Sequence, residues 1–211
     1  MQRNAFQNSL RDKQAEGLYL LYGSEQYLLD YVKRFLKEDF LPEESVMLNL
    51  TTLSAETVTA SQVMEACETL PVFSDKRVVI VDDCDFTKEG ISAYKNLYEG
   101  LHEYIQTLPR GLVLVMISPK EGLFKGRFVK QAEKNGELVS YQKLQEGELQ
   151  QFIRSRAKKE GRTLTPGAQR LFIQRSEYLN KEENKNLYDI DHHLGSLFDA
   201  KDGPIEEADV V

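Results

Sequence analysis

The sequence has few cysteines and no closely spaced pair of them. Cys67 and Cys84 are the only two among 211 residues, whereas a structural zinc site or a redox motif needs thiols a few positions apart. Of the three histidines, His192 and His193 are adjacent, so on a helix they point in different directions and do not chelate a metal as an i, i+4 pair does. We therefore expect two reduced, buried cysteines, no metal site and no cofactor.

Long apolar runs are also missing. The longest, Leu112 to Ile117, is far too short to cross a bilayer. The chain opens with Gln2, Arg3 and Asn4, and no apolar segment of the kind found in secretory signals follows them. These absences predict a cytoplasmic protein without a membrane partner.

An excess of positive charge is absent as well. The chain has 34 acidic and 27 basic residues, which gives a net charge of −7. Proteins that bind nucleic acid on their own usually carry a basic surplus, because neutralising phosphates supplies most of the non-specific affinity. The charge balance favours protein partners over nucleic acid.

What the sequence does contain is an alternating pattern of strand-like and helix-like segments. Up to about residue 142, short β-branched or apolar runs alternate with segments of helical periodicity. These helical segments end before Pro42, Pro71, Pro109 and Gly136. This alternation predicts right-handed βαβ units and a parallel sheet, hence an α/β domain over residues 1–142. The predicted strands are Leu18–Tyr22, Val46–Leu50, Val78–Asp82, Leu112–Ile117 and Leu138–Tyr141.

Residues 143–211 show only helical patterns. One amphipathic helix runs to about Gly161, Thr165 followed by Pro166 gives an N-cap and first turn, and a further helix ends near Gly203. Ile205–Val211 resembles the start of another helix. We predict a small helical domain over 143–211, in a chain that ends inside a longer protein.

The loop after the first strand lacks the residues that bind phosphate. A P-loop needs G-x-x-x-x-G-K-[ST], so that backbone N–H groups and a lysine surround the phosphates. Here Gly23 is followed by Ser24 and Glu25, with no lysine, and a carboxylate at this place repels a triphosphate. The sequence argues against nucleotide binding at this loop.

No catalytic constellation is present either. Asp82 and Asp83 follow the apolar strand at a Walker B-like position, but magnesium there would lack the phosphates that it normally bridges. No G-x-S-x-G or related hydrolase pattern occurs. We predict no active site.

The segment Leu70, Pro71, Val72 and Phe73 is unusually apolar for a loop. Apolar residues between a helix and a strand commonly cap the core. The alternative is an exposed anchor that enters a partner's pocket, where a few side chains carry most of the binding energy. Composition leaves both interpretations open.

Basic residues gather in two places. One group is on the approach to and along a predicted helix, and the other is in and just after the first predicted helix of the second domain. Acidic residues interrupt both groups. A solvated face and a track for nucleic acid are both compatible with this pattern. The groups are Lys120, Lys125, Arg127 and Lys130, and Arg154, Arg156, Lys158, Lys159 and Arg162.

Three blocks, in order, resemble the delta subunit family of the bacterial DNA polymerase III clamp loader. The first is Leu20-Leu21-Tyr22-Gly23-Ser24-Glu25 with Tyr27-Leu28-Leu29, and the second is Leu70 to Arg77 running into Val78-Val79-Ile80-Val81. The third is Asn186-Leu187-Tyr188-Asp189-Ile190 with Leu194 and Leu197, which resembles the family's lid helix.

The resemblance implies an AAA+ (P-loop NTPase-like) domain that lacks a P-loop, followed by a helical lid and, beyond this chain, a collar domain. It implies a subunit without intrinsic activity that binds the beta sliding clamp and holds the ring open, within an assembly that contains delta prime and tau or gamma subunits and DNA. The clamp-binding loop maps to Leu70, Pro71, Val72 and Phe73. Thr69 stands where many clamp-binding peptides have glutamine.

Three other hypotheses remain. The chain could be an ATPase with an atypical loop, or a DNA-binding module that acts through Arg154, Arg156, Lys158 and Lys159. It could also be the sister stator subunit, but the zinc-binding cysteines and S-R-C motif typical of that subunit are missing.

Overall fold

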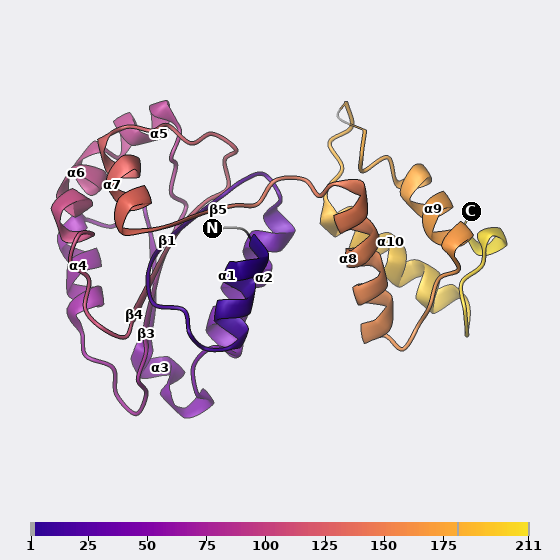
Figure 1. Ribbon diagram of the computed structural model, residues 1–211, viewed down its shortest axis with the longest axis horizontal. Coiled ribbons are helices and arrows are strands. Elements are labelled where there is room, and N and C mark those ends of the chain that lie inside the picture. The colour runs from indigo at the N-terminus through magenta and orange to yellow at the C-terminus, as the bar shows by residue number, and fades with distance from the viewer. Residues whose placement is uncertain (1–2, 181, 211) are drawn as a thin grey trace. The chain divides into compact units, whose positions relative to one another are not determined.

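The computed structural model describes residues 3–180 and 182–210. The chain divides into two compact units, residues 1–142 and 143–211, and each is described by itself. Figure 1 shows the first as a sheet with helices and the second as helices. No helix in the described part of the chain is long and apolar enough to cross a membrane.

The first unit is built on a sheet of five parallel strands in the order β2-β3-β4-β1-β5. The central strands β3 and β4 are almost completely buried, as expected where helices cover both faces of a sheet. The predicted α/β fold with a parallel sheet is confirmed. The strands are β1 (Gly17–Tyr22), β2 (Leu50–Ser54), β3 (Arg77–Asp82), β4 (Leu112–Ser118) and β5 (Gly136–Ser140).

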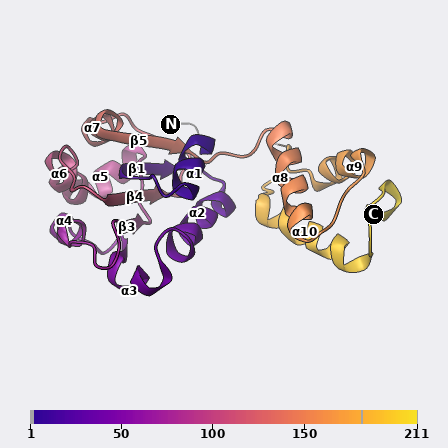
Figure 2. The same ribbon diagram turned by 60° about the horizontal axis from the view of Figure 1, so that its bottom comes forward.

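Helices form a layer on each face of this sheet. Figures 1 and 2 show α1 (Arg3–Arg11) and α2 (Gln26–Glu38) on one face, and α4 (Ala60–Glu68), α6 (Lys95–Tyr104) and α7 (Arg127–Asn135) on the other. On the second face the ring of Tyr98 packs between Phe86 and Phe128, with centroid separations of 6.1 and 4.9 Å. The short α5 (Lys88–Ala93) follows β3.

One predicted strand was wrong. Val46–Leu50 is not a strand: Val46–Asn49 forms the short helix α3, after a 3-10 turn at Glu43–Ser45, and the strand starts at Leu50. The true strand β2 lies at the edge of the sheet and reads Leu-Thr-Thr-Leu-Ser, none of it fully buried. An edge strand needs fewer apolar residues than a central one, so the more apolar neighbouring run was mistaken for it.

Two helices were not predicted, and several ends differ by a few residues. α1 and α5 were missed. Tyr141 follows β5 instead of ending it. Such shifts are usual, because helix ends are weakly encoded.

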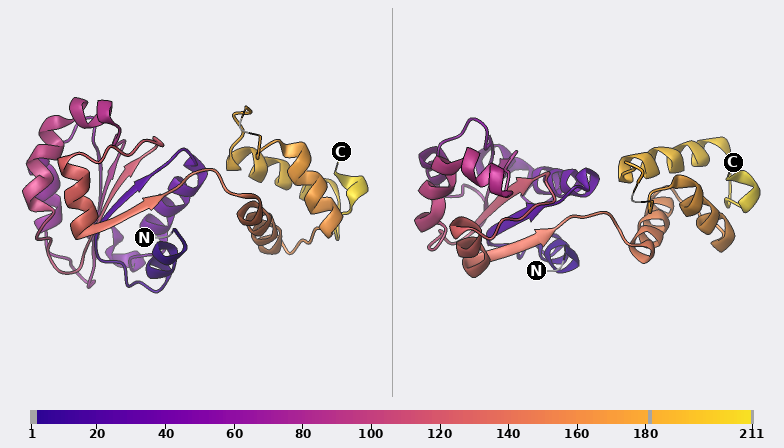
Figure 3. Two further views of the ribbon diagram at one scale, coloured as in Figure 1. Left: turned by 45° about the horizontal axis from the view of Figure 1, so that its top comes forward. Right: turned by 90° about the horizontal axis from the view of Figure 1, so that it is seen from above.

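The second unit contains α8 (Glu146–Lys159), α9 (Pro166–Ser176) and α10 (Leu187–Ala200), which Figure 3 shows in two further views. Thr165 caps α9 as predicted, because its hydroxyl accepts a hydrogen bond from the Ala168 N–H at 3.2 Å. The predicted helix at Ile205–Val211 was wrong: Ile205 pairs with Leu164 in an isolated bridge, and only a 3-10 turn, Glu207–Asp209, follows. Val211 lies outside the described residues.

Candidate protein-binding surface

The apolar loop between α4 and β3 is exposed. Phe73 is 82% exposed, Leu70 78% and Val72 43%, and Pro71 is half-buried. Exposed apolar side chains that gather in one short segment often mark an interaction site. These side chains therefore do not cap the core, and the choice that composition left open is settled against burial.

The helix α3 adds two exposed apolar residues beside this loop. Met47 is 95% exposed and Leu48 49%. The next residue, Asn49, hydrogen-bonds both main-chain groups of Val72 at 2.7 Å, so α3 and the loop are direct neighbours. Figures 1 and 2 show α3 beside the start of β3. Met47 and Leu48 extend the exposed apolar surface that Leu70, Val72 and Phe73 begin.

A buried arginine holds the base of the loop. Arg77, the first residue of β3, is 7% exposed. Its Nε donates to the Ala66 carbonyl at 2.9 Å and one terminal nitrogen donates to the Leu48 carbonyl at 2.6 Å. The other terminal nitrogen donates to the Thr51 hydroxyl at 2.8 Å. One guanidinium thus joins the end of α4, α3 and β2 to the strand that follows the loop.

Glu16 ties the loop to the neighbouring strands. Its carboxylate accepts from Lys76 Nζ at 2.6 Å and from the Gly111 N–H at 3.0 Å. Both hydrogen bonds lower the pKa of Glu16 below its ordinary value of 4.5, and the one from Lys76 has the larger effect. Glu16, Lys76 and Gly111 directly precede β1, β3 and β4, so these contacts lie at the amino end of the parallel sheet.

Because of this carboxylate, the free energy of unfolding of the first unit should vary with pH in the acid range. A lowered pKa means that the contribution of Glu16 is present above its ordinary pKa and is lost as the pH falls through the lowered value. The Glu16 side chain is 46% exposed, so we expect a contribution below about 1 kcal/mol. Urea unfolding of the unaltered chain and of Glu16→Gln should differ at pH 7 and converge as the pH falls below the lowered pKa of Glu16. A difference that is constant across this range would contradict the assignment.

At the carboxyl end of the sheet, the loop after β1 uses its N–H groups internally. The Gly23 N–H donates to the Ser118 carbonyl at 3.2 Å, and the Glu25 N–H donates to the Tyr141 carbonyl at 2.9 Å. A Cβ at Gly23 would lie 2.1 Å from the Tyr141 carbonyl oxygen. Parallel α/β sheets usually bind ligands at this end, but here the Gly23 and Glu25 amides already have partners within the protein.

The two aspartates at the Walker B-like position also have partners. Asp82 accepts from Lys33 Nζ at 2.9 Å, and the same ammonium lies 2.7 Å from Asp30. Partial burial of Lys33 disfavours its charge, but the hydrogen bonds to Asp30 and Asp82 outweigh it and raise the pKa of Lys33. Asp83 accepts from the Ser54 hydroxyl at 2.8 Å. Within the described residues, no group of three or more metal-ligating side chains occurs.

These contacts predict that the chain does not bind ATP. In isothermal titration with millimolar ATP and Mg²⁺ we expect no saturable heat, because the loop amides and Asp82 would have to give up their present partners. A saturable 1:1 isotherm would contradict this account and revive the ATPase hypothesis.

The structure separates the basic residues on and just after α8. Arg156 pairs with Asp191 on α10 and with Glu160 at 2.6 Å, and Arg162 donates to the Phe198 carbonyl at 2.9 Å. Arg154, Lys158 and Lys159 are exposed. The first basic group is divided in a similar way, because Lys125 pairs with Glu133 and Arg127 with Glu103. Arg156 is thus paired within the helical unit, while the other three residues proposed to face DNA are exposed, and a contact of these residues with DNA stays a prediction.

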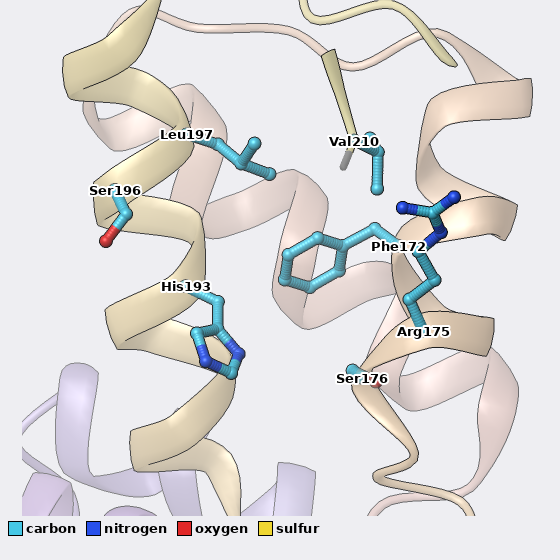
Figure 4. A pocket seen from close by; sticks show the side chains of 7 residues that line it. All are labelled: Phe172, Arg175, Ser176, His193, Ser196, Leu197 and Val210. Carbon is cyan, nitrogen blue, oxygen red and sulfur yellow. The ribbon is translucent and has the colours of Figure 1, made fainter. Parts of the chain in front are cut away.

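The helical unit contains a pocket that the sequence did not indicate. It has a volume of about 310 Å³, and Figure 4 shows its lining from α9, α10 and the segment after them. Because the lining comes from three separate segments, no local motif marks the pocket. The lining residues are Phe172, Arg175, Ser176, His193, Ser196, Leu197 and Val210.

Known proteins resemble this chain in both sequence and fold. Residues 19–142, more than half of the chain, match the family described as DNA polymerase III, delta subunit. The DNA polymerase III subunit delta of Bacillus subtilis is 27% identical over 172 residues, which cover 78% of this chain and 49% of that protein. The chain therefore spans about half the length of this relative.

Two solved structures show the same architecture. The Bacillus subtilis DNA clamp loader delta protein superposes with a TM-score of 0.69 at 24% identity, over 98% of this chain and 60% of that one. Thermotoga maritima RuvB superposes with a TM-score of 0.56 at 13% identity, over 98% of this chain and 64% of that one. At these identities the structures establish the AAA+-like fold alone. The family match carries the assignment: this chain belongs to the DNA polymerase III delta subunit family.

Proposed function

We propose that this chain is the clamp-gripping part of a DNA polymerase III clamp loader and that its exposed loop inserts into the beta sliding clamp. The observation that carries the proposal is the exposure of Val72 and Phe73 on a loop whose base is fixed. Binding hot spots are aromatic or apolar side chains that enter a pocket on a partner. The membership of the chain in the delta family indicates which partner to test.

The loop lies where binding does not compete with a nucleotide site. Its supports, Asn49, Glu16, Lys76 and Gly111, precede the strands of the parallel sheet, whereas Gly23 and Asp82 stand at the strands' carboxyl ends. The two regions are thus at opposite ends of the sheet. This arrangement suits a subunit that does no covalent chemistry itself and works beside ATP-binding subunits. The proposal places this work in the cytoplasm.

The proposed work is a shift of the ring's equilibrium. A protein favours an open clamp only by its difference in affinity for the open and closed states. Loop residues that fit a pocket near one ring interface, and contacts that only the open interface permits, would supply that difference. The delta prime and tau or gamma subunits and DNA are the further partners that this proposal includes.

Ring opening is tested with a clamp labelled by a self-quenching fluorophore pair across one interface. Adding this chain without ATP should increase fluorescence in a saturable way if it favours the open ring. A clamp that binds the chain with no change in fluorescence would limit the proposal to gripping. Absence of binding would remove the proposed function altogether.

A further inference from the structure

One buried side chain holds the exposed loop by both of its polar atoms. Asn49 is completely buried at the end of α3. Its Nδ2 donates to the Val72 carbonyl and its Oδ1 accepts from the Val72 N–H, both at 2.7 Å. The amide therefore pairs with one residue reciprocally, as two residues do in an antiparallel ladder. These two hydrogen bonds together fix both the position and the direction of the main chain at Val72.

The next residue needs such support. Phe73 has φ +57°, in the left-handed region, which bulky residues with a Cβ rarely adopt. Phe73 is 82% exposed, so side-chain packing does not hold it in this conformation. The backbone on its other side is held by the Lys76 N–H, which donates to the Ser74 hydroxyl at 3.1 Å, and by the salt bridge from Lys76 to Glu16.

We propose that Asn49 is a positioning residue that holds Phe73 in the conformation that meets the partner. The inference rests on the proposed function for the identity of that partner, the sliding clamp. A loop fixed before binding loses less conformational freedom on binding, so the affinity is higher than for the same residues on a mobile loop. Asn49 does not itself need to touch the clamp, since its side chain is buried.

Two substitutions separate the two hydrogen bonds. Asn49→Asp keeps the size and the acceptor for the Val72 N–H, but removes the donor and places a carboxylate against the Val72 carbonyl oxygen. Asn49→Ala removes both hydrogen bonds. We expect each variant to bind the clamp roughly tenfold more weakly, the size expected for the loss of one or two buried hydrogen bonds that order a loop.

A partner-free readout reports the loop directly. Chymotrypsin cleaves after exposed phenylalanine, and a chain held at Val72 resists the extended conformation that a protease requires. At a temperature where all variants are fully folded, cleavage after Phe73 should be several-fold faster in Asn49→Asp and Asn49→Ala. Val129→Ala, a buried change on α7, controls for a general loss of stability and should leave this rate and the clamp affinity close to those of the unaltered chain.

Coupling to Phe73 distinguishes positioning from general stabilisation. Phe73→Leu retains an apolar side chain and should bind measurably but weakly. If Asn49 acts through residue 73, adding Asn49→Asp to Phe73→Leu should cost less affinity than Asn49→Asp costs alone. Fully additive losses would overturn the positioning role.

The remaining outcomes separate this inference from the proposed function. Clamp affinity and cleavage rates unchanged in both Asn49 variants would overturn the role of Asn49 and leave the proposed function intact. No clamp binding by the unaltered chain would overturn the proposed function and the partner assigned here, whatever the cleavage rates show.

Discussion

Replacing Val72 and Phe73 together by alanine is expected to weaken clamp binding at least about 100-fold. Each apolar side chain that becomes fully buried contributes about 1.5–3 kcal/mol, and about 3 kcal/mol already corresponds to more than a hundredfold in affinity. Phe73 is 82% exposed and Val72 43% in the free chain, so the change should have little effect on folding. Surface plasmon resonance against immobilised clamp, without ATP, measures the affinity, and thermal unfolding checks the fold.

The matched control is Phe124→Ala in the same unit. Phe124 is also an exposed phenylalanine, at 41%, but it lies before α7, away from the loop. The Phe124→Ala variant should bind the clamp with the same affinity as the unaltered chain. Equal losses in the double variant and in Phe124→Ala would show that the binding does not depend on the loop.

Replacing Arg77 by methionine is expected to lower the free energy of unfolding by about 2–4 kcal/mol. The guanidinium is buried and hydrogen-bonds the Ala66 and Leu48 carbonyls and the Thr51 hydroxyl. Methionine fills much of the volume but leaves these three groups without their donor. Burial lowers the pKa of Arg77, yet arginine stays charged at neutral pH, so the hydrogen bonds persist.

Urea unfolding at pH 7 measures this effect, with Arg34→Met as the control. Arg34 is exposed on α2, and its replacement should change stability by less than about 0.5 kcal/mol. Because Arg77 joins α3 to the base of the loop, Arg77→Met should also weaken clamp binding at temperatures where it remains folded. A stability equal to that of Arg34→Met would show that the three hydrogen bonds contribute little.

The central sheet could be predicted from the sequence because its strands are nearly all apolar. Val78–Val81 and Leu112–Ile117 are buried on both faces, and short apolar runs between helical patterns indicate such strands. The edge strand β2 was misplaced, since its two adjacent threonines and closing serine carry a weaker signal than the more apolar Val46–Asn49 beside it. Contacts distant in sequence stabilise the helical conformation of Val46–Asn49. Arg77 donates to the Leu48 carbonyl, and the Val72 N–H donates to the Asn49 side chain.

The loop could be located from the sequence, but its supports could not. Leu70 to Phe73 is conspicuous because apolar residues follow a helix end, yet the same pattern fits a core cap, and only the structure shows the exposure of Phe73. Asn49 and Glu16 lie 23 and 60 residues from the residues that they hold. No local pattern links them, because the contact depends on the order of the parallel strands.

The most direct test of the account places a photo-reactive benzoylphenylalanine at position 73 and irradiates the chain with its cognate clamp in the absence of ATP. A covalent 1:1 adduct is expected from position 73, and none from a matched probe at position 124. Adducts that form from probes at 154 or 158 on α8, with none from position 73, would contradict the claim that this loop grips the clamp.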